Sequence, residues 1–505
     1  MKILLTTLNS KYVHSNLALK YLYTVVAGEY SDIEVREYTI NNDPDYVYSE
    51  LVRANYDMVC FSCYIWNVEH IKVLGRELKL ARPELKICVG GPEVSYCGPE
   101  FARENPWADY ILCGEGEYSF YRFCQVLNEP VKAFETVPGL IYREDGKIYV
   151  NCQIEPMDFN LIPFPYSILD CEEDRVVYYE SSRGCPFGCA YCLSAAEQGV
   201  RALDMDRVKS EIGYFIYKKV MQVKFIDRTF NYDKNRAYEI FRYIMDNDNG
   251  VTNFHFEICA DLLDDRTLEL LKGARRGLFD FEIGIQSCNP QTLVAINRKE
   301  NVYPVLYNTE RLVKMGNIHV HVDLIAGLPY ETYELFKRSF NKVYDLKADA
   351  LQLGFLKVLT GTPLARQIQA HGIVYRDHAP YEVIATDYIK AEELVRLKMI
   401  ENMVDVYYNR GGYEKTLDYL IDALGKGAFG FFENLAEFYY ESGFQHASRK
   451  KEDQYRILFK FSRKLSAEGI LLQADIKALA TLDADMQQAM NTDTYKRFLR
   501  KGWEI

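Results

Sequence analysis

The sequence alternates between short apolar runs typical of β-strands and longer amphipathic patterns typical of helices, and it does so twice. The first alternation contains strand-like runs at 2–7, 32–38, 57–63, 86–91 and 109–114. Five strands separated by helical patterns predict βαβ units and a doubly wound parallel sheet. In such a sheet a ligand lies beyond the carboxyl ends of the strands.

Three segments that directly follow these strands have the composition of ligand-binding loops. They are TTLNS (6–10), GGPE (90–93) and GEGE (114–117). Paired glycines let the backbone approach a ligand closely. No G-x-G-x-x-G follows the first strand, which disfavours a nucleotide in this position. Farther on, residues 138–151 predict a hairpin that turns at Asp145-Gly146.

The second alternation predicts a barrel. Its strand-like runs lie at 176–182, 222–228, 253–259, 280–287, 318–327 and 350–358, and helical periodicity dominates after about 376. Six strand–helix units predict a partial (β/α)6 TIM-type barrel with function at the carboxyl ends of its strands. We therefore predict an α/β chain with four parts: a doubly wound Rossmann-like domain (1–135), a hairpin and linker (136–172), the barrel (173–372) and a mainly helical C-terminal module (373–505).

Composition restricts the compartment and the class of ligand. The formal net charge is −12 and the pI is near 5.4, which disfavours a general nucleic-acid binder. The opening MKILLTTLNS is typical of a first strand and not of a signal peptide, and no apolar stretch reaches the roughly 20 residues of a membrane span. Thirteen cysteines in a chain of 505 residues therefore predict a cytoplasmic protein that uses thiols for metal binding or catalysis.

The segment SSRGCPFGCAYCLS places Cys185, Cys189 and Cys192 directly after the first barrel strand. Three thiolates leave one ligand position of a metal centre open, as in a 4Fe–4S cluster with one iron that has no protein ligand. The alternative is a structural zinc site completed by a distant residue such as Cys171 or a histidine. By contrast, Cys60 and Cys63 follow the strand period and are typical of core packing.

RGCPFGCAYC resembles the signature loop of radical S-adenosylmethionine (SAM) enzymes. The resemblance continues through FIDRTF (225–230), FEICADLL, IGIQS (283–287) with Asn297-Arg298, DLIAGLPYET (323–332) and LKVLTGTPLA (356–365), and so covers about 175–370. It implies that the three cysteines ligate a 4Fe–4S cluster. It also implies that SAM lies among Tyr191, Asp227, Glu257, Gln286, Ser287, Arg298, Asp323 and Leu356. The alternative for the acidic residues is a structural role at the strand ends, in pairs with arginines.

The front domain resembles the cobalamin-binding module of cobalamin-dependent radical SAM enzymes. The resemblance implies a corrin site made by Asn9, Ser10, Ser62, Gly90, Gly91, Pro92, Glu115 and Gly116. The D-x-H-x-x-G motif that supplies a histidine ligand in many cobalamin proteins is missing from residues 1–135. We therefore expect the lower face of the corrin to have no histidine ligand. The alternative is a domain that keeps this fold without the corrin.

Together these resemblances imply an enzyme that reductively cleaves SAM to a 5′-deoxyadenosyl radical, with cobalamin as second cofactor. The simplest activity is methyl transfer to an unactivated carbon. Two alternatives stay open: a radical rearrangement, cyclisation or reduction without methyl transfer, and a non-catalytic zinc-binding scaffold. The radical reading also implies an electron donor such as flavodoxin or ferredoxin as partner.

Overall fold

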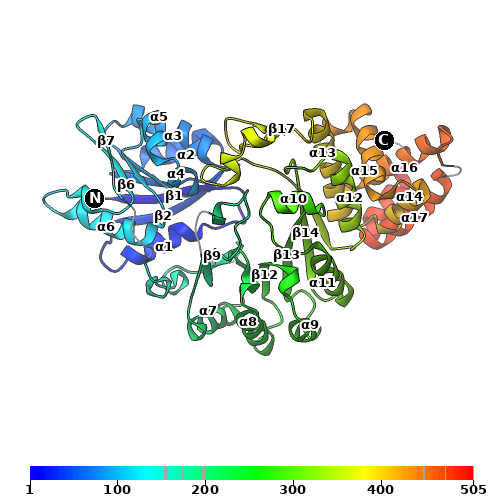
Figure 1. Ribbon diagram of the computed structural model, residues 1–505, viewed down its shortest axis with the longest axis horizontal. Coiled ribbons are helices and arrows are strands. Elements are labelled where there is room, and N and C mark those ends of the chain that lie inside the picture. The colour runs from blue at the N-terminus through cyan, green and yellow to red at the C-terminus, as the bar shows by residue number, and fades with distance from the viewer. Residues whose placement is uncertain (153–156, 173, 196–198, 447–449, 472–473, 504–505) are drawn as a thin grey trace.

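The computed structural model describes residues 1–152, 157–172, 174–195, 199–446, 450–471 and 474–503. Its N-terminal part is a twisted sheet whose five parallel strands have the order β2-β1-β3-β4-β5 (Figure 1). These are β1 (Ile3–Asn9), β2 (Ile33–Thr39), β3 (Met58–Ser62), β4 (Lys86–Gly90) and β5 (Tyr110–Leu112). All five predicted strands are confirmed, because their apolar runs are buried by helices on both faces of the sheet.

Helices α1 (Leu17–Val26) and α6 (Gly116–Asn128) contact one another on one face of this sheet. The other helices of the domain are α2 (Pro44–Arg53), α3 (Val68–Ala81), α4 (Pro92–Ser95) and α5 (Gly98–Glu104). The predicted hairpin forms β6 (Leu140–Glu144) and β7 (Lys147–Val150), with Asp145 and Gly146 at positive φ in the turn. Strand β6 pairs antiparallel with β5, so the hairpin extends the front sheet.

The second sheet is the predicted partial barrel, with six parallel strands in the order β15-β14-β13-β12-β11-β8. The strands are β8 (Val177–Tyr179), β11 (Gln222–Phe225), β12 (Asn253–Ile258), β13 (Phe279–Gln286), β14 (His319–Ala326) and β15 (Ala350–Phe355). The helices around it include α7 (Met205–Tyr217), α8 (Lys234–Asp246), α9 (Asp265–Leu271), α10 (Pro290–Ala295), α11 (Val302–Met315) and α12 (Tyr333–Tyr344).

The strand pair β9–β10 was not predicted. The run 176–182 does not form one strand: β8 ends at Tyr179, and a separate strand β9 (Ser182–Cys185) pairs antiparallel with β10 (Gly199–Ala202). Gly184 has φ 90°, and a Cβ there would lie 2.2 Å from the carbonyl oxygen of Gly199. The two strands can therefore approach only because this residue is a glycine. The hairpin carries the first cysteine at its end.

The C-terminal part is mainly helical, as predicted, and it packs beside β15 and α12 (Figure 1). Its helices are α13 (Ala391–Val404), α14 (Glu414–Leu424), α15 (Gly427–Glu441), α16 (Lys451–Ala467), α17 (Ala474–Ala489) and α18 (Thr492–Lys501). The helical pattern expected from about residue 376 begins later, at Ala391, because β17 (Val383–Ala385) pairs with β16 (Val374–Tyr375). Within the described residues, no helix has the length and apolar character that crossing a membrane requires. The divisions at 135, 172 and 372 stay predictions.

Candidate active site between the front sheet and the barrel

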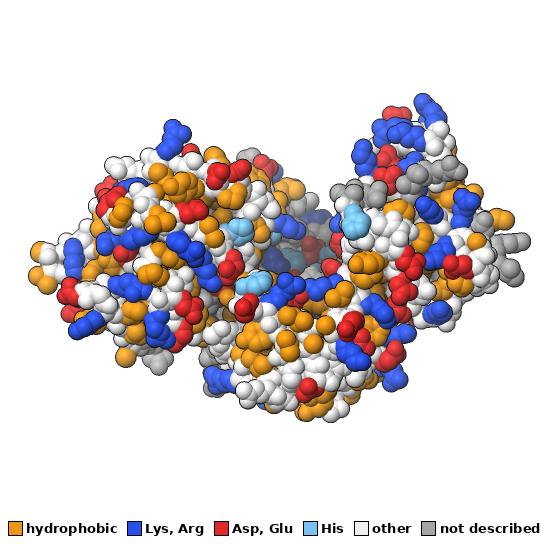
Figure 2. All heavy atoms as spheres, turned by 90° about the horizontal axis from the view of Figure 1, so that it is seen from above, with side chains coloured by type: hydrophobic (Ala, Val, Ile, Leu, Met, Phe, Trp, Pro, Cys, Tyr) orange, Lys and Arg blue, Asp and Glu red, His pale blue; other side chains and the backbone are white. Residues whose placement is uncertain are grey.

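A cavity of about 830 Å³ lies between the carboxyl edge of the front sheet and the mouth of the barrel. Viewed from above, the surface is hollowed between the N-terminal part on the left and the C-terminal part on the right (Figure 2). Both sheets contribute to the cavity wall, the front sheet through the ends of β1, β3, β4 and β5 and the barrel through β8, β11 and β12, and the separate strand β9 contributes as well. The crevice predicted at the strand ends is therefore shared by two domains.

Every residue predicted to contact cobalamin lines this cavity: Asn9, Ser10, Ser62, Gly90, Gly91, Pro92, Glu115 and Gly116. They come together because parallel strands end at one edge of a sheet. Gly91 has φ 106°, and a Cβ there would lie 2.6 Å from the carbonyl oxygen of Cys63. At this point the backbone itself forms the wall, which suits a broad flat ring with hydrogen-bonding side chains.

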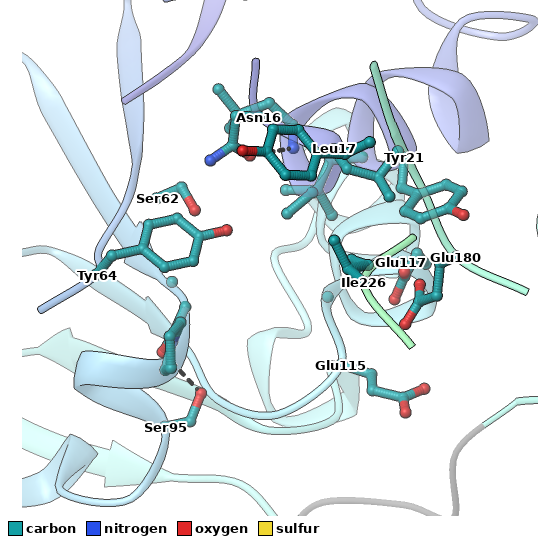
Figure 3. A pocket seen from close by; sticks show the side chains of 18 of the residues that line it. Asn16, Leu17, Tyr21, Ser62, Tyr64, Ser95, Glu115, Glu117, Glu180 and Ile226 are labelled. Carbon is teal, nitrogen blue, oxygen red and sulfur yellow. Dashed lines mark hydrogen bonds between the residues drawn. The ribbon is translucent and has the colours of Figure 1, made fainter. Parts of the chain in front are cut away.

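An aromatic pair on the same wall was missed by the sequence reasoning. The rings of Tyr64 and Trp66 stack with their centroids 4.4 Å apart and their planes 6° apart, and both residues line the cavity. In Figure 3, Tyr64 points into the cavity opposite Glu117, Glu180 and Ile226. The sequence does contain a sign of this pair, because in SCYIWN (62–67) two aromatic residues follow the end of a predicted strand. Stacked rings offer a flat apolar surface of the kind that a macrocycle can lie on.

The cysteine loop is fixed to the barrel from two sides. Asn297 Nδ2 donates to the carbonyl oxygen of Gly188 across 2.7 Å. The backbone of Ala190 accepts from the N–H of Leu364 and donates to Ile296, in each case across 2.8 Å. Burial raises the pKa of the Cys189 thiol, and the nearby positive charge of Arg298 opposes that rise. A cation beside the loop favours thiolate, which is the form that binds metal.

The three cysteines of the loop are available to bind metal. Cys185, Cys189 and Cys192 are free thiols and partly exposed. Three free thiols on one loop suit either a 4Fe–4S cluster or a zinc ion with a fourth ligand. A second group of possible ligands, Cys259, Asp261 and Glu300, has ligand atoms that all lie within 4.8 Å of one another.

Arg298 lies beside the loop and is already bound to protein groups. Its Nη2 lies 2.7 Å from a carboxylate oxygen of Glu300, and it also donates to the carbonyl oxygen of Gly284. Its Nη1 donates to the hydroxyl of Tyr191 across 3.1 Å. The guanidinium therefore orients Tyr191, and its predicted contact with the SAM carboxylate stays a prediction.

Asp227 and Ser287 are buried and do not line the cavity. Asp227 is 1% exposed and accepts from Ser181 N (2.9 Å), Ser181 Oγ (2.6 Å) and Ser182 Oγ (2.6 Å). Ser287 is fully buried and donates to Glu331 across 2.6 Å. A structural role at a strand end was the alternative expected for the acidic residues, and these contacts of Asp227 fit such a role. Its hydrogen-bond partners are serines, however, and not the arginine that was expected.

Gln286 has the signs of a ligand-contacting residue. It ends β13 with φ 66°, at an irregularity in the pairing with β14. Its Oε1 is buried without a hydrogen-bond partner among the described residues. Strained backbone and an unpaired buried acceptor are both uncommon in a structural position. Leu356 is buried next to the carbonyl of Ala326.

Charged side chains fill the barrel interior below the cavity. Lys224 and His255 both contact Glu282, at 3.1 and 3.0 Å. Burial alone would raise the pKa of Glu282, but the His255 hydrogen bond and the Lys224 charge lower it to about 2. Glu257 pairs with Glu282 in strand register and lines the cavity, and burial together with this neighbouring charge raises its pKa to about 7.

Asp323 adds one further acid to this interior, where its carboxylate lies 3.2 Å from His321 Nε2. The predicted SAM residues thus divide into a wall group and an interior group. Among them Glu257 lines the cavity itself. The fold and the cysteine loop have the features of one class of protein, in which a radical SAM domain follows a Rossmann-like domain.

Comparison with protein-family models agrees with this class. Residues 3–123 match the B12 binding domain, residues 179–343 the radical SAM superfamily, and residues 369–502 a protein family of unknown function, DUF4080. The chain therefore carries a B12-binding domain, a radical SAM domain and a DUF4080 domain. A radical SAM domain implies SAM and a 4Fe–4S cluster, and the B12-binding domain implies cobalamin.

Curated relatives match this chain at low identity. A 2-(S-pantetheinyl)-carbapenam-3-carboxylate methyltransferase of Streptantibioticus cattleyicolor is 26% identical, over 56% of this chain and 44% of the relative. The cobalamin-dependent radical SAM methyltransferase TokK of Streptomyces tokunonensis is 24% identical, over 63% and 49%. An anaerobic magnesium-protoporphyrin IX monomethyl ester cyclase of Rubrivivax gelatinosus is 24% identical, over 64% and 60%. The chain spans about half the length of the first two relatives.

Solved structures share the fold. The cobalamin-dependent SAM radical enzyme OxsB with aqua-cobalamin bound aligns with a TM-score of 0.65 at 15% identity, covering 99% of this chain and 84% of that one. The radical SAM methyltransferase TsrM from Kitasatospora setae, with cobalamin and a [4Fe-4S] cluster bound, aligns at 0.60 and 17% identity, covering 75% and 79%. At these identities the likeness concerns the fold alone.

Proposed function

We propose that this protein is a cobalamin-dependent radical SAM methyltransferase that acts at an unactivated carbon of its substrate. The observation that carries the proposal is the shared cavity. Its front wall holds all eight residues expected to contact corrin, and its opposite wall includes Gly184 of the cysteine hairpin and Glu257 of the barrel. A methyl carrier and a radical source must face one substrate, and this cavity provides such a place.

The cofactors would supply the chemistry. The cluster would donate the electron that cleaves SAM, and cobalamin would carry the methyl group. The chain would supply binding and orientation. Cys185, Cys189 and Cys192 would hold the cluster, and Tyr191, Glu257 and Gln286 would lie nearest to SAM. Arg298 would hold Tyr191, while Asp227 and Ser287 would keep the walls in place. Asp323 and Leu356 complete the proposed SAM surroundings.

A second candidate is a radical cyclisation without methyl transfer. It is favoured by the cyclase of Rubrivivax gelatinosus, which matches 64% of this chain. The two candidates differ in what becomes of SAM. Methyl donation leaves S-adenosylhomocysteine, whereas reductive cleavage leaves 5′-deoxyadenosine and methionine. In either case we propose a one-electron protein donor, such as flavodoxin or ferredoxin, as the partner.

The test is anaerobic reconstitution with iron and sulfide, followed by incubation with cobalamin, reductant and methyl-labelled SAM. Methyltransferase function predicts 5′-deoxyadenosine together with S-adenosylhomocysteine that forms only when cobalamin is present. Ser62→Phe, which places bulk beside Tyr64 at the cavity wall, should abolish the cobalamin-dependent product and leave the cluster intact. Deoxyadenosine without S-adenosylhomocysteine would favour the cyclisation, and neither product would contradict both candidates.

A further inference from the structure

An arginine two residues before the first cluster cysteine reaches into the front domain. Arg183 lies in β9, and its guanidinium contacts Glu180 at 3.0 Å, Glu115 at 3.3 Å, and Glu117. Glu115 and Glu117 belong to the GEGE segment that follows β5, in which Glu115 and Gly116 were expected to contact corrin. One side chain thus joins the cysteine hairpin to a wall of the proposed corrin site.

The contact is buried and sterically confined. The side chain of Arg183 is 11% exposed, and that of Glu117 is 8% exposed. The guanidinium lies 5.4 Å from the ring centre of Tyr21 and 4.6 Å from that of Phe159. Breaking a buried ion pair by removing one partner is strongly destabilising, and a planar arginine stacked on aromatic rings has few other orientations. The hairpin and the GEGE segment should therefore move together.

A second arginine repeats the connection from the neighbouring strand. Arg201 of β10 lies directly opposite Arg183 in the β9–β10 register. It forms an ion pair with Glu115, and its Nη1 donates to the carbonyl oxygen of Met157 across 3.2 Å. The same hairpin pairs Gly199 with Cys185. Both strands that frame the start of the cysteine loop thus hold the GEGE segment.

The other side of the cavity has an independent connection. The segment after β15 meets the front domain where Tyr381 donates to Glu93 across 3.0 Å. A Cβ on Gly361 would lie 2.6 Å from the ring of Tyr96, so the chain packs tightly there. Three residues on, the N–H of Leu364 donates to Ala190, between the second and third cysteines. The GGPE side of the cavity is therefore linked to the cysteine loop as well.

We propose that Arg183 is a positioning residue that couples occupation of the cobalamin site to the geometry of the cluster loop, so that each cofactor is bound more tightly when the other is present. The inference rests on the proposed function, because it requires both cofactors. Coupling between two sites is reciprocal and commonly amounts to about 5- to 150-fold in affinity. Here the two-sided connection through Arg183 and the segment 361–364 would carry it.

The experiment measures cobalamin affinity of the full chain by equilibrium titration, before and after cluster reconstitution. Wild-type protein should bind cobalamin at least about five-fold more tightly when the cluster is present. Arg183→Lys keeps the charge but loses the planar fork, so the ratio of the two affinities should fall below that of wild type, while the connection through 361–364 remains. Arg201→Gln, at a more exposed position, should lower the ratio partly. Arg275→Lys is the matched control, because Arg275 holds Asp248 at 2.8 Å before β13, at the opposite end of the barrel.

The ratio separates coupling from simple loss of structure, since a purely structural role would weaken both affinities and leave their ratio unchanged. An Arg183→Lys ratio equal to that of wild type overturns the proposal. If Arg183→Lys does not fold, an unchanged ratio in Arg201→Gln overturns it instead. Wild-type protein that binds cobalamin equally well with and without the cluster overturns the coupling alone. Wild-type protein that binds no cobalamin overturns the cobalamin part of the proposed function as well.

Discussion

Arg298 Nη1 donates to the hydroxyl oxygen of Tyr191 across 3.1 Å, and this hydrogen bond joins the segment after β13 to the loop that holds the three cysteines. The aromatic ring next to Cys192 is thus oriented by an arginine that is itself held by Glu300. The position of the ring depends on a chain of contacts that spans more than a hundred residues of sequence.

Tyr191→Phe should weaken SAM binding to the reconstituted protein by about ten-fold. A hydrogen bond to a charged group contributes ~1.5 kcal/mol or more, and 1.4 kcal/mol corresponds to a factor of ten. Equilibrium dialysis with labelled SAM measures the change. Tyr303→Phe, on an exposed position of α11, is the control. Equal affinities of wild type and Tyr191→Phe would show that this hydroxyl does not order the site.

Asp227→Asn should reduce both stability and iron content. Asp227 accepts three hydrogen bonds from Ser181 and Ser182, and an amide can no longer accept all of them. Leaving a buried donor unpaired costs about 1–3 kcal/mol. Because Ser182 begins β9, the first cysteine should also lose its placement. Thermal unfolding and iron per chain measure the two effects, with exposed Asp246→Asn as control. A variant with wild-type thermal stability and wild-type iron content would contradict the proposal that Asp227 holds Ser181 and Ser182 in place.

Glu331→Gln should change how stability depends on pH. Burial raises the pKa of Glu331 to about 7 in the folded chain, although Ser287 and Ser339 hydrogen-bond to it. In the unfolded chain the Glu331 carboxyl ionises near pH 4.5, well below its pKa in the folded chain. The free energy of unfolding of wild type should therefore fall by about 3 kcal/mol as the pH rises from about 4.5 to 7. Glutamine has no such loss. The unfolding free energy of the variant minus that of wild type should therefore increase over this range.

Urea unfolding at several pH values measures this difference. Glu392→Gln, at an exposed position of α13, should show a constant difference from wild type. A pH-independent difference for Glu331→Gln as well would mean that the buried carboxyl is ionised throughout.

Gly91→Ala should destabilise the front domain and lower cobalamin affinity. Its φ of 106° is a conformation that other residues adopt only at a cost of about 1–3 kcal/mol, and the added Cβ would meet Cys63. Gly28→Ala is the matched control, since nothing lies within 4 Å of a Cβ there. Thermal unfolding and retention of the corrin absorbance through gel filtration measure both. If the two variants behave alike, the backbone at Gly91 does not form the wall of the site.

The strands were predictable from sequence because their physical signal is local. KICVGG and IHVHVDLIAG show the apolar content and alternation of buried parallel strands, and both form strands at the predicted places. The gathering of Asn9, Gly90 and Glu115 around one cavity followed from a general property, namely that parallel strands end at the same edge.

Other features depended on long-range packing that no local pattern reports. Asp227 has the sequence context of a ligand-binding acid, but it is buried and hydrogen-bonded to Ser181, just before β9, and to Ser182, the first residue of β9. The role of Arg183 depends on a loop nearly seventy residues earlier in the chain. The β9–β10 pairing forms because Gly184 permits close approach, which the sequence does not distinguish from a turn glycine.

The most direct test of the central claim is to quantify 5′-deoxyadenosine formed from SAM by anaerobically reconstituted, reduced protein. A protein with one 4Fe–4S cluster that cleaves SAM should contain about four iron and four sulfide per chain and should form deoxyadenosine. Cys185→Ala, Cys189→Ala and Cys192→Ala should each abolish the product, while Cys124→Ala, a change in the core of the front domain away from the cavity lining, should retain it. Stoichiometric zinc in the anaerobically purified protein, or a fully loaded and reduced cluster that yields no deoxyadenosine, would contradict it.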